Sequence, residues 1–493
     1  MLFNSYAYLV FFLPITFGLC WLASRTGGRW AVIATLTAAS LFFYGWWDPR
    51  YLALLLGSVV VNFALGEVLH RRTPHRRAWL AAGVAANLAA IGWYKYAGFL
   101  AGNAEALFGG RWSIPEVALP LAISFFTFQQ IAYLVDVYRG EAPRYDPLRY
   151  ALFVTFFPQL IAGPIVRHQE TIPQLGLERD ASLVRSDLAV GLSILLLGLF
   201  KKVVLADSFA VWATPVFDAA ARGASPGALE AWGAALSYSF QLYFDFSGYC
   251  DMAIGSARLF GVKLPANFES PYRATSIIDF WRRWHMTLSR FLRDYLYIPL
   301  GGSRRGTGRR YLNLLVTMLL GGLWHGAGWT FVLWGGLHGL LLVVNHGWRA
   351  VRGRREGGGR VFAAPLGWLF TFVSVVFAWV LFRAADLASA VAIYEGMLGR
   401  NGLGGQSPRL GGLEQVEWLI LGFAVVLLLP TSQHWMSDWR PVLQHRDHAD
   451  PEPTSALPLR WRPSPVWAVT VGLLGLVALT RLTRVSEFLY FQF

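Results

Sequence analysis

The chain has 493 residues, of which 55% are hydrophobic and only 15% carry a charge. This composition argues against a soluble globular protein and indicates a polytopic membrane protein. The net charge of +14 would be compatible with a nucleic-acid partner, but the arginines are concentrated in alternate loops between apolar stretches. That distribution is typical of a multi-span membrane protein, so no nucleic acid is expected as a partner.

Ten apolar stretches follow one another along the chain, each approaching the length that crosses about 30 Å of hydrocarbon as a helix. They lie at 8–23, 30–47, 51–69, 79–100, 117–137, 188–206, 329–344, 361–381, 416–430 and 467–479. Two further segments, 145–165 and 229–260, are interrupted by Pro, Gly and acidic residues, which predicts re-entrant or buried helices. We therefore predict one all-α membrane domain over residues 1–493, with about ten to twelve transmembrane helices plus re-entrant or interfacial helices.

The basic loops predict the orientation of the chain. Arginines lie in the first loop (25–29), the third loop (71–77) and after the fifth stretch (139–149). These three loops are expected on one side, the cytoplasmic one, which leaves both chain ends outside. The first stretch lacks a preceding basic region and a small-residue cleavage site, so it is predicted to be retained as a span.

Neither a disulfide framework nor a metal site is predicted. Cys20 and Cys250 lie far apart in apolar sequence, and no CxxC motif occurs. Histidines and aspartates also gather around His434 and along the polar connector that follows it. Their irregular spacing and Pro-rich context favour a solvated loop, so the connector is assigned no role.

The first candidate site lies around His285. Ser276, followed three residues later by Asp279, predicts a helix start, and the helix is expected to run to about Tyr297. Apolar residues recur at helical spacing on one face and arginines on the other, and His285 falls on the apolar face. An ionisable group there indicates a functional site. The alternatives are a structural core histidine, or an interfacial helix whose arginines meet lipid phosphates.

The second candidate site is the break at Trp324-His325-Gly326. A helix from Tyr311 to Leu323 would rise only about 20 Å, so the break is expected at membrane depth. Irregular backbone at that depth must line a protein-enclosed cavity, and the surrounding glycines permit close backbone approach. His325 is therefore expected beside a passage for a thin substrate. The alternative is a glycine kink with a satisfied histidine. His338 is a weaker candidate.

Ordered motifs along the chain resemble the membrane-bound O-acyltransferase family, and within it the bacterial branch that acetylates exopolysaccharides, typified by the alginate O-acetyltransferase membrane subunit. They occur in family order and cover essentially the whole chain: 156–165, 243–249 with 251–253, 280–289 with 293–297, 324–326, and an aromatic tail at 488–493.

The resemblance implies a helical bundle around a central tunnel, with His325 as the catalytic residue and His285 as the second essential group. Imidazole suits acyl transfer because it exchanges protons near neutral pH, so His325 is expected to be the general base. His285 is expected to orient the end of the acyl donor or to stabilise charge on the thioester oxygen. Supporting residues of the tunnel wall are expected to be Trp281, Trp324, Tyr243, Asp245 and Asp251, the two acids pairing with buried cations or amides.

The resemblance also implies the substrates and partners. The expected co-substrate is acetyl-coenzyme A, with no bound cofactor, and candidate contacts to its phosphates are Arg282, Arg283, Arg304 and Arg305. These arginines equally fit simple positive-inside topology and lipid contact. The expected acceptor is an extracytoplasmic polysaccharide such as alginate, reached through a periplasmic acetyltransferase of the SGNH type, at the bacterial inner membrane. Peptidoglycan, cellulose and D-alanylated teichoic acid are alternative acceptors. Outside acyl transfer, the alternative class of function is a transporter.

Overall fold

The computed structural model describes residues 1–71, 74–110, 118–175, 181–352, 360–404, 412–443, 457, 459–482 and 489. These residues form helices and connecting loops, and no β-strand occurs among them. The predicted all-α class is confirmed. Among the described residues, four helical segments are long and apolar enough to cross a membrane: Ala7–Thr26, Arg50–His70, Val184–Ala221 and Ala364–Arg383. The total of ten to twelve spans stays a prediction.

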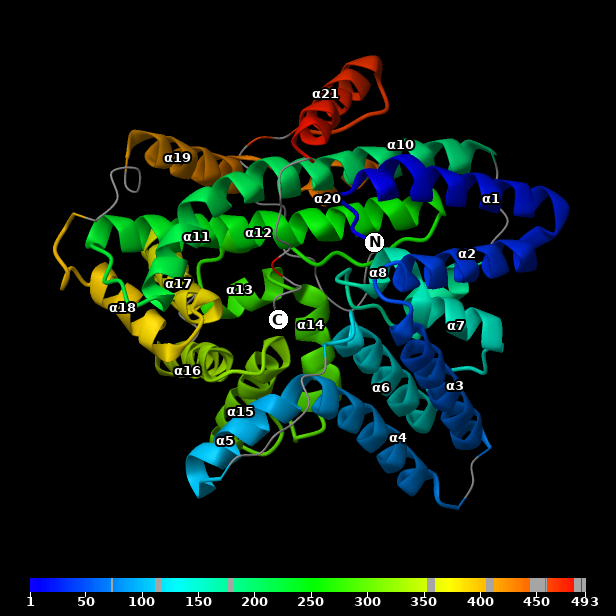
Figure 1. Ribbon diagram of the computed structural model, residues 1–493, viewed down its shortest axis with the longest axis horizontal. Helices are drawn as coiled ribbons and strands as arrows, with labels where there is room; N and C mark the ends of the chain where they lie inside the picture. The colour runs from blue at the N-terminus through cyan, green and yellow to red at the C-terminus, as the bar shows by residue number, and fades with distance from the viewer. Residues whose placement is uncertain are drawn as a thin grey trace.

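Most of the first third of the chain forms one end of the bundle (Figure 1). Its helices are α1 (Leu13–Thr26), α2 (Gly28–Gly45), α3 (Arg50–His70), α4 (Arg76–Ile91), α5 (Ala97–Phe108), α6 (Ile123–Arg139), α7 (Pro147–Thr155) and α8 (Phe157–Leu160). Two π-helical turns interrupt this series: η1 (Ala7–Phe12) leads into α1, and η2 (Gly92–Tyr96) joins α4 to α5.

The remaining helices build the centre and the other end (Figure 1). They are α9 (His168–Thr171), α10 (Ala181–Phe200), α11 (Asp207–Ala221), α12 (Ala228–Leu259), α13 (Ile277–Arg283), α14 (Met286–Leu292), α15 (Thr307–His325), α16 (Trp329–Arg352), α17 (Arg360–Arg383), α18 (Leu387–Met397), α19 (Leu413–Leu428), α20 (Ser432–Trp435) and α21 (Pro465–Arg481). The apolar stretch predicted at 188–206 is longer in the structure, because α10 continues through a π-turn into α11.

Helix α12 crosses the middle of the bundle and is buried along nearly its whole length. The sequence prediction that 229–260 is buried is confirmed, but the glycines in it do not break the helix. They allow α10 to approach instead: a Cβ on Gly248 would lie 2.8 Å from the Gly198 carbonyl oxygen, and one on Gly255 would lie 2.6 Å from that of Gly191. Small residues at such crossings let two helix backbones meet closely.

The two aspartates of α12 are paired, as expected from their burial. Asp245 lies 2.6 Å from Lys202 Nζ, and Asp251 lies 2.6 Å from Lys201 Nζ. Gln433 also donates to Asp251, at 2.6 Å. A buried carboxylate without such partners would carry a large desolvation cost. The pairs therefore hold α12 to the π-turn between α10 and α11.

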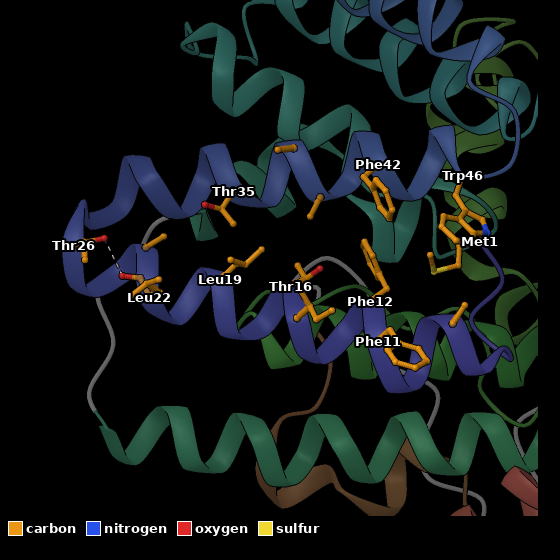
Figure 2. Close-up of a pocket in the computed structure, with 15 residues that line it drawn as sticks. Met1, Phe11, Phe12, Thr16, Leu19, Leu22, Thr26, Thr35, Phe42 and Trp46 are labelled. Atoms are coloured by element: carbon orange, nitrogen blue, oxygen red, sulfur yellow. Dashed lines mark hydrogen bonds between the residues drawn. The ribbon is translucent and has the colours of Figure 1, made fainter.

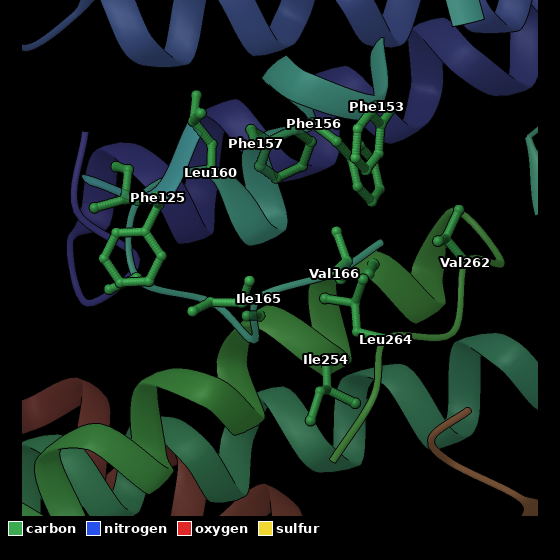
Figure 3. Close-up of a cluster of buried hydrophobic side chains, with 14 of the residues drawn as sticks. Phe125, Phe153, Phe156, Phe157, Leu160, Ile165, Val166, Ile254, Val262 and Leu264 are labelled. Carbon is green, nitrogen blue, oxygen red and sulfur yellow. The ribbon is translucent and has the colours of Figure 1, made fainter. Parts of the chain in front are cut away.

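The short helix α8 packs against α12, and α7 before it packs against α2. Figure 3 shows Phe153, Phe156 and Phe157 on one side of a buried cluster and Ile254 and Leu264 on the other. This confirms that the segment predicted at 145–165 is buried, with the helix ending at Thr155 and restarting at Phe157.

Three basic loops meet on one side of the bundle, as the sequence predicts. The Arg149 guanidinium lies 5.0 Å from the centre of the Trp30 ring, and Arg29 lies 5.6 Å from the same ring. Arg76 donates to the carbonyl oxygen of Tyr138 at 3.1 Å, so the start of α4 meets the end of α6. We call this side, marked by Arg29, Arg76, Arg139 and Arg149, the basic face.

The polar connector after α19 is described only in part. His434 Nδ1 donates a hydrogen bond to Glu269 Oε1 at 2.8 Å, which ties α20 to the segment before α13. The other histidines and aspartates of the connector, at 445–450, lie outside the described residues, as does most of the aromatic tail. Leu489, the described residue of that tail, is buried.

Candidate active site

His285 sits at a kink between two short helices. Ser276 caps α13 as predicted, accepting a hydrogen bond from the Asp279 amide at 3.2 Å. The helix then ends at Arg283, resumes as α14 and continues as a π-turn to Tyr297, so the predicted end is confirmed but the prediction of one unbroken helix is wrong. His285 has a φ of +43°, in the left-handed region that a residue with a Cβ rarely occupies. Strain of this kind persists only where surrounding contacts impose it.

Asn267 supplies those contacts from the extended segment after α12. Its backbone oxygen accepts from the Met286 amide at 3.0 Å, and its Oδ1 accepts from the Thr287 amide at 3.2 Å and from Thr287 Oγ1 at 2.9 Å. His285 Nδ1 lies 3.1 Å from the same Oδ1. Because an amide N–H bonds that atom, it is an oxygen, and His285 Nδ1 must be the donor. In this tautomer Nε2 is the hydrogen-bond acceptor of the ring.

His325 is the last residue of α15, which confirms the predicted break at Gly326. The two helices flanking the break are packed closely: a Cβ on Gly322 would lie 2.2 Å from the Phe331 carbonyl oxygen, and one on Gly335 would lie 2.2 Å from that of Met318. Only glycine fits at these positions without separating α15 from α16. Helix α15 begins at Thr307, four residues earlier than the apolar run suggests.

The fold brings the two predicted histidines together. Their ring centroids are 6.2 Å apart, although the two residues come from different helices. Both are buried, with 1% of His285 and 5% of His325 exposed. Aromatic rings surround His325: Trp324 at 4.9 Å, Trp334 at 5.1 Å and Phe382 at 5.2 Å. The pair is thus held in a largely apolar cage, where a polar interaction is stronger than in water.

Sequence reasoning missed two residues that hold the end of α15. Lys95 Nζ donates to the carbonyl oxygens of Trp324 at 2.6 Å and of His325 at 3.1 Å. Tyr96 donates from its hydroxyl to the carbonyl oxygen of Leu323 at 2.9 Å. Both come from the π-turn η2, a feature that recurs at functional sites. The sequence feature that could have identified this contact is Lys95 itself, a charged residue within the apolar stretch 79–100.

A cavity of about 40 Å³ lies beside His325, enough room for a water molecule. It is lined by Lys95, Ser124 and Trp324, and by the loop that leads into α6. Helical rise places Lys95 about 28 Å from Arg76 along α4 and η2, and Ile123 about 24 Å from Arg139 along α6. Both Arg76 and Arg139 mark the basic face, so the cavity lies toward the opposite end of the bundle.

Comparison with known proteins places this site in a family. The model described as "MBOAT, membrane-bound O-acyltransferase family" matches residues 138–383. A peptidoglycan O-acetyltransferase from Helicobacter pylori is 45% identical over 433 residues, which cover 82% of this chain and 81% of that protein. The chain belongs to the membrane-bound O-acyltransferase family. It is therefore an acyltransferase, and a multi-pass membrane protein.

Other relatives of the chain carry names that state different activities. A protein from Azotobacter vinelandii named "Probable alginate O-acetylase AlgI" is 41% identical over 405 residues, covering 80% of this chain and 78% of that protein. A teichoic acid D-alanyltransferase from Streptococcus thermophilus is 29% identical over 290 residues, covering 53% of this chain and 68% of that protein. The three relatives share acyl transfer and differ in the acceptor named.

The other predicted residues of the acyltransferase fall into two groups. Trp324 lies at the histidine pair, 6.2 Å from His285, and Trp281 lies at His338, donating to its Nδ1 at 3.3 Å. Tyr243 packs against Trp284, while Asp245 and Asp251 form the ion pairs of α12. A continuous tunnel stays a prediction.

The predicted donor-binding arginines differ in their surroundings. Arg283 is buried and already engaged, bonded to the Asp279 carboxylate at 2.9 Å and to the Glu269 carbonyl oxygen at 3.3 Å. Arg282, Arg304 and Arg305 are exposed. Arg283 therefore has a structural role in the wall, and only the exposed arginines are accessible to a soluble anion.

Proposed function

We propose that this acyltransferase takes an acetyl group from acetyl-coenzyme A at the basic face and delivers it at the opposite end, for O-acetylation of an extracytoplasmic glycan. The observation that supports this is the His285–His325 pair, 6.2 Å apart, with a cavity beside His325 on the side away from the basic face. A donor and an acceptor can then approach the pair from different ends.

In the proposed reaction His325 is the general base. It removes the proton from an acceptor hydroxyl as that oxygen attacks the thioester carbonyl carbon. A C–O bond forms, the C–S bond breaks, and the imidazolium of His325 returns the proton to the departing coenzyme A thiolate. Such positioned proton transfer contributes about 10²- to 10⁴-fold to a rate. The surrounding aromatic rings exclude water that would otherwise hydrolyse the thioester.

His285 is proposed to orient the donor. Its Nδ1 donates to Asn267, so Nε2 can accept a hydrogen bond but cannot stabilise the thioester oxygen by donating one. Of the two roles considered for His285, orientation therefore fits this tautomer. The pantetheine arm of coenzyme A carries amide N–H groups that such an acceptor would bind. The exposed Arg282, Arg304 and Arg305 are the proposed contacts for the phosphates.

The acceptor is proposed to be reached through a periplasmic SGNH-type acetyltransferase, whose serine hydroxyl would enter the cavity beside His325. The relatives named for alginate and for peptidoglycan supply the two candidate glycans. The 45% identity to the peptidoglycan enzyme supports peptidoglycan as a candidate beside alginate. Cellulose is an exported polysaccharide and falls in the first arm of the test; D-alanylated teichoic acid is the alternative that stands if the parent restores acetate on neither glycan. In this arrangement the basic face is cytoplasmic and both chain ends are periplasmic. A reporter active only in the cytoplasm should then give no signal when fused to the carboxyl end.

The test uses cells lacking this chain, complemented with the parent, with His325→Ala or with His75→Ala. His75 is an exposed histidine next to the start of α4 and is the matched control. Base-labile acetate is measured separately on exported polysaccharide and on peptidoglycan, at equal amounts of membrane protein. The parent and His75→Ala should restore acetate on one of the two glycans, and His325→Ala should not. Restoration by His325→Ala would exclude it as the base. Failure of the parent on both glycans would exclude these acceptors.

A further inference from the structure

A long apolar groove lies between α1 and α2, far from the histidine pair. It has a volume of about 800 Å³ and runs from Met1 and Trp46 at one end to Leu22 and Thr26 at the other. Figure 2 shows its lining side chains facing each other across the two helices. Large apolar residues of its wall are left exposed, among them Phe11 at 62% and Leu19 at 50%. The groove needs an apolar occupant.

The dimensions of the groove suit a lipid chain. From Phe11 to Thr26 the helix rises about 22 Å, and the groove along it has a volume of about 800 Å³. A helix with its side chains has a diameter of about 10 Å or more, whereas an acyl chain is much narrower and can lie within the groove. The charge at one end of the groove decides between a lipid and an apolar helix.

One end of the groove is cationic and aromatic. The Arg25 guanidinium lies 5.1 Å from the centre of the Trp21 ring, and Arg29 lies 5.6 Å from Trp30, whose ring also meets Arg149. Within the described part of the chain, no carboxylate pairs with Arg25 or Arg29, although Arg149 has Asp146 at 3.5 Å. Tryptophan and arginine together are typical of the headgroup level of a membrane. Two uncompensated charges there suit a phosphate.

We propose that this groove binds an anionic phospholipid, with an acyl chain along α1 and α2 and the phosphate at Arg25 and Arg29. Basic pockets between membrane helices are known to hold anionic headgroups. The bound lipid would fill the groove between the two helices of the α1–α2 hairpin. Phe12 itself lines the groove, so a lipid bound there would touch the same ring that packs on Phe43 and Phe157 and would stabilise the placement of the hairpin on the bundle.

The test is native mass spectrometry of the full chain in detergent, titrated with dioleoylphosphatidylglycerol or dioleoylphosphatidylcholine. The parent should bind the anionic lipid at least tenfold more tightly. Arg25→Ala/Arg29→Ala should weaken that binding about thirtyfold and leave the zwitterionic lipid unchanged. The matched control is Arg71→Ala/Arg77→Ala, two exposed arginines where α3 meets α4, which should change neither affinity by more than about twofold.

A second pair of variants tests the groove itself. Ala38→Trp fills it, because Ala38 lines the groove, and should weaken both lipids. Ala34→Trp, one turn earlier on α2 and exposed outside the groove lining, should weaken neither. Equal affinity of the parent for both lipids would overturn the proposal, as would equal effects of the two arginine pairs. Loss of a dimer in Ala38→Trp, with lipid binding retained, would assign the groove to a second copy and overturn it as well.

Discussion

Replacing Lys95 with methionine should reduce acyl transfer strongly without removing the protein from the membrane. Methionine keeps the length and apolar stem of the side chain but leaves the carbonyl oxygens of Trp324 and His325 without their donor. A hydrogen bond to a charged group contributes about 1.5–3 kcal/mol. If about 2–3 kcal/mol of that is lost from the placement of His325 in the transition state, the rate falls about 30- to 160-fold.

The assay is base-labile acetate on the acetylated glycan, divided by the amount of chain in the membrane. Lys95→Arg keeps a cationic donor and should recover activity to within about tenfold of the parent. Tyr96→Phe loses one neutral hydrogen bond and should cost about fivefold. Tyr94→Phe is its control, since within the described part of the chain the Tyr94 hydroxyl makes no hydrogen bond, and the residue is half-buried in the same turn. Normal activity of Lys95→Met at normal abundance would refute the reasoning.

Three further changes test the frame around the site. Asn267→Ala removes the acceptor that fixes the His285 tautomer and should lower acetyl transfer about 10- to 100-fold. Asn267→Asp keeps an acceptor and should lose less activity, so equal losses in the two variants would contradict this. Gly335→Ala forces α16 away from α15 and should cost about 1–3 kcal/mol, seen as a lower unfolding temperature in detergent; an unchanged temperature would contradict it. Lys202→Met strands the Asp245 carboxylate and should cost about 3–5 kcal/mol, partly restored by adding Asp245→Asn; a double variant less stable than the single would contradict it.

The break at His325 was predictable because its cause is local. Gly321, Gly322 and Gly326 interrupt the apolar run within six residues, and short-range sequence is enough to read them. The kink at His285 has a distant cause. The periodicity of 277–297 is helical, and the left-handed backbone of His285 is imposed by Asn267, which reaches it from the segment after α12. Tertiary contacts of this kind override helical propensity and leave no local mark.

The aspartates of α12 and the lysine of η2 follow the same rule, that a buried charge needs a partner. Asp245 and Asp251 were expected to find cations because a buried carboxylate is costly, and Lys202 and Lys201 provide them. Lys95 carries the same signal in the stretch 79–100. Its partners are backbone carbonyls at the end of another helix, and a helix end is a tertiary target that the lysine's own sequence neighbourhood does not reveal.

Those carbonyls explain why a cation is built next to His325. The C-terminal end of a helix carries partial negative charge and unsatisfied carbonyl groups, and at membrane depth there is no bulk water to satisfy them. Lys95 and Tyr96 satisfy them from one π-turn, and in doing so fix the residue that faces His285 at 6.2 Å. The same contacts therefore satisfy the backbone carbonyls and hold the base, His325, in place. Lys95→Arg separates the two effects, because it restores the charge while shifting the donor atoms by the geometry of a guanidinium.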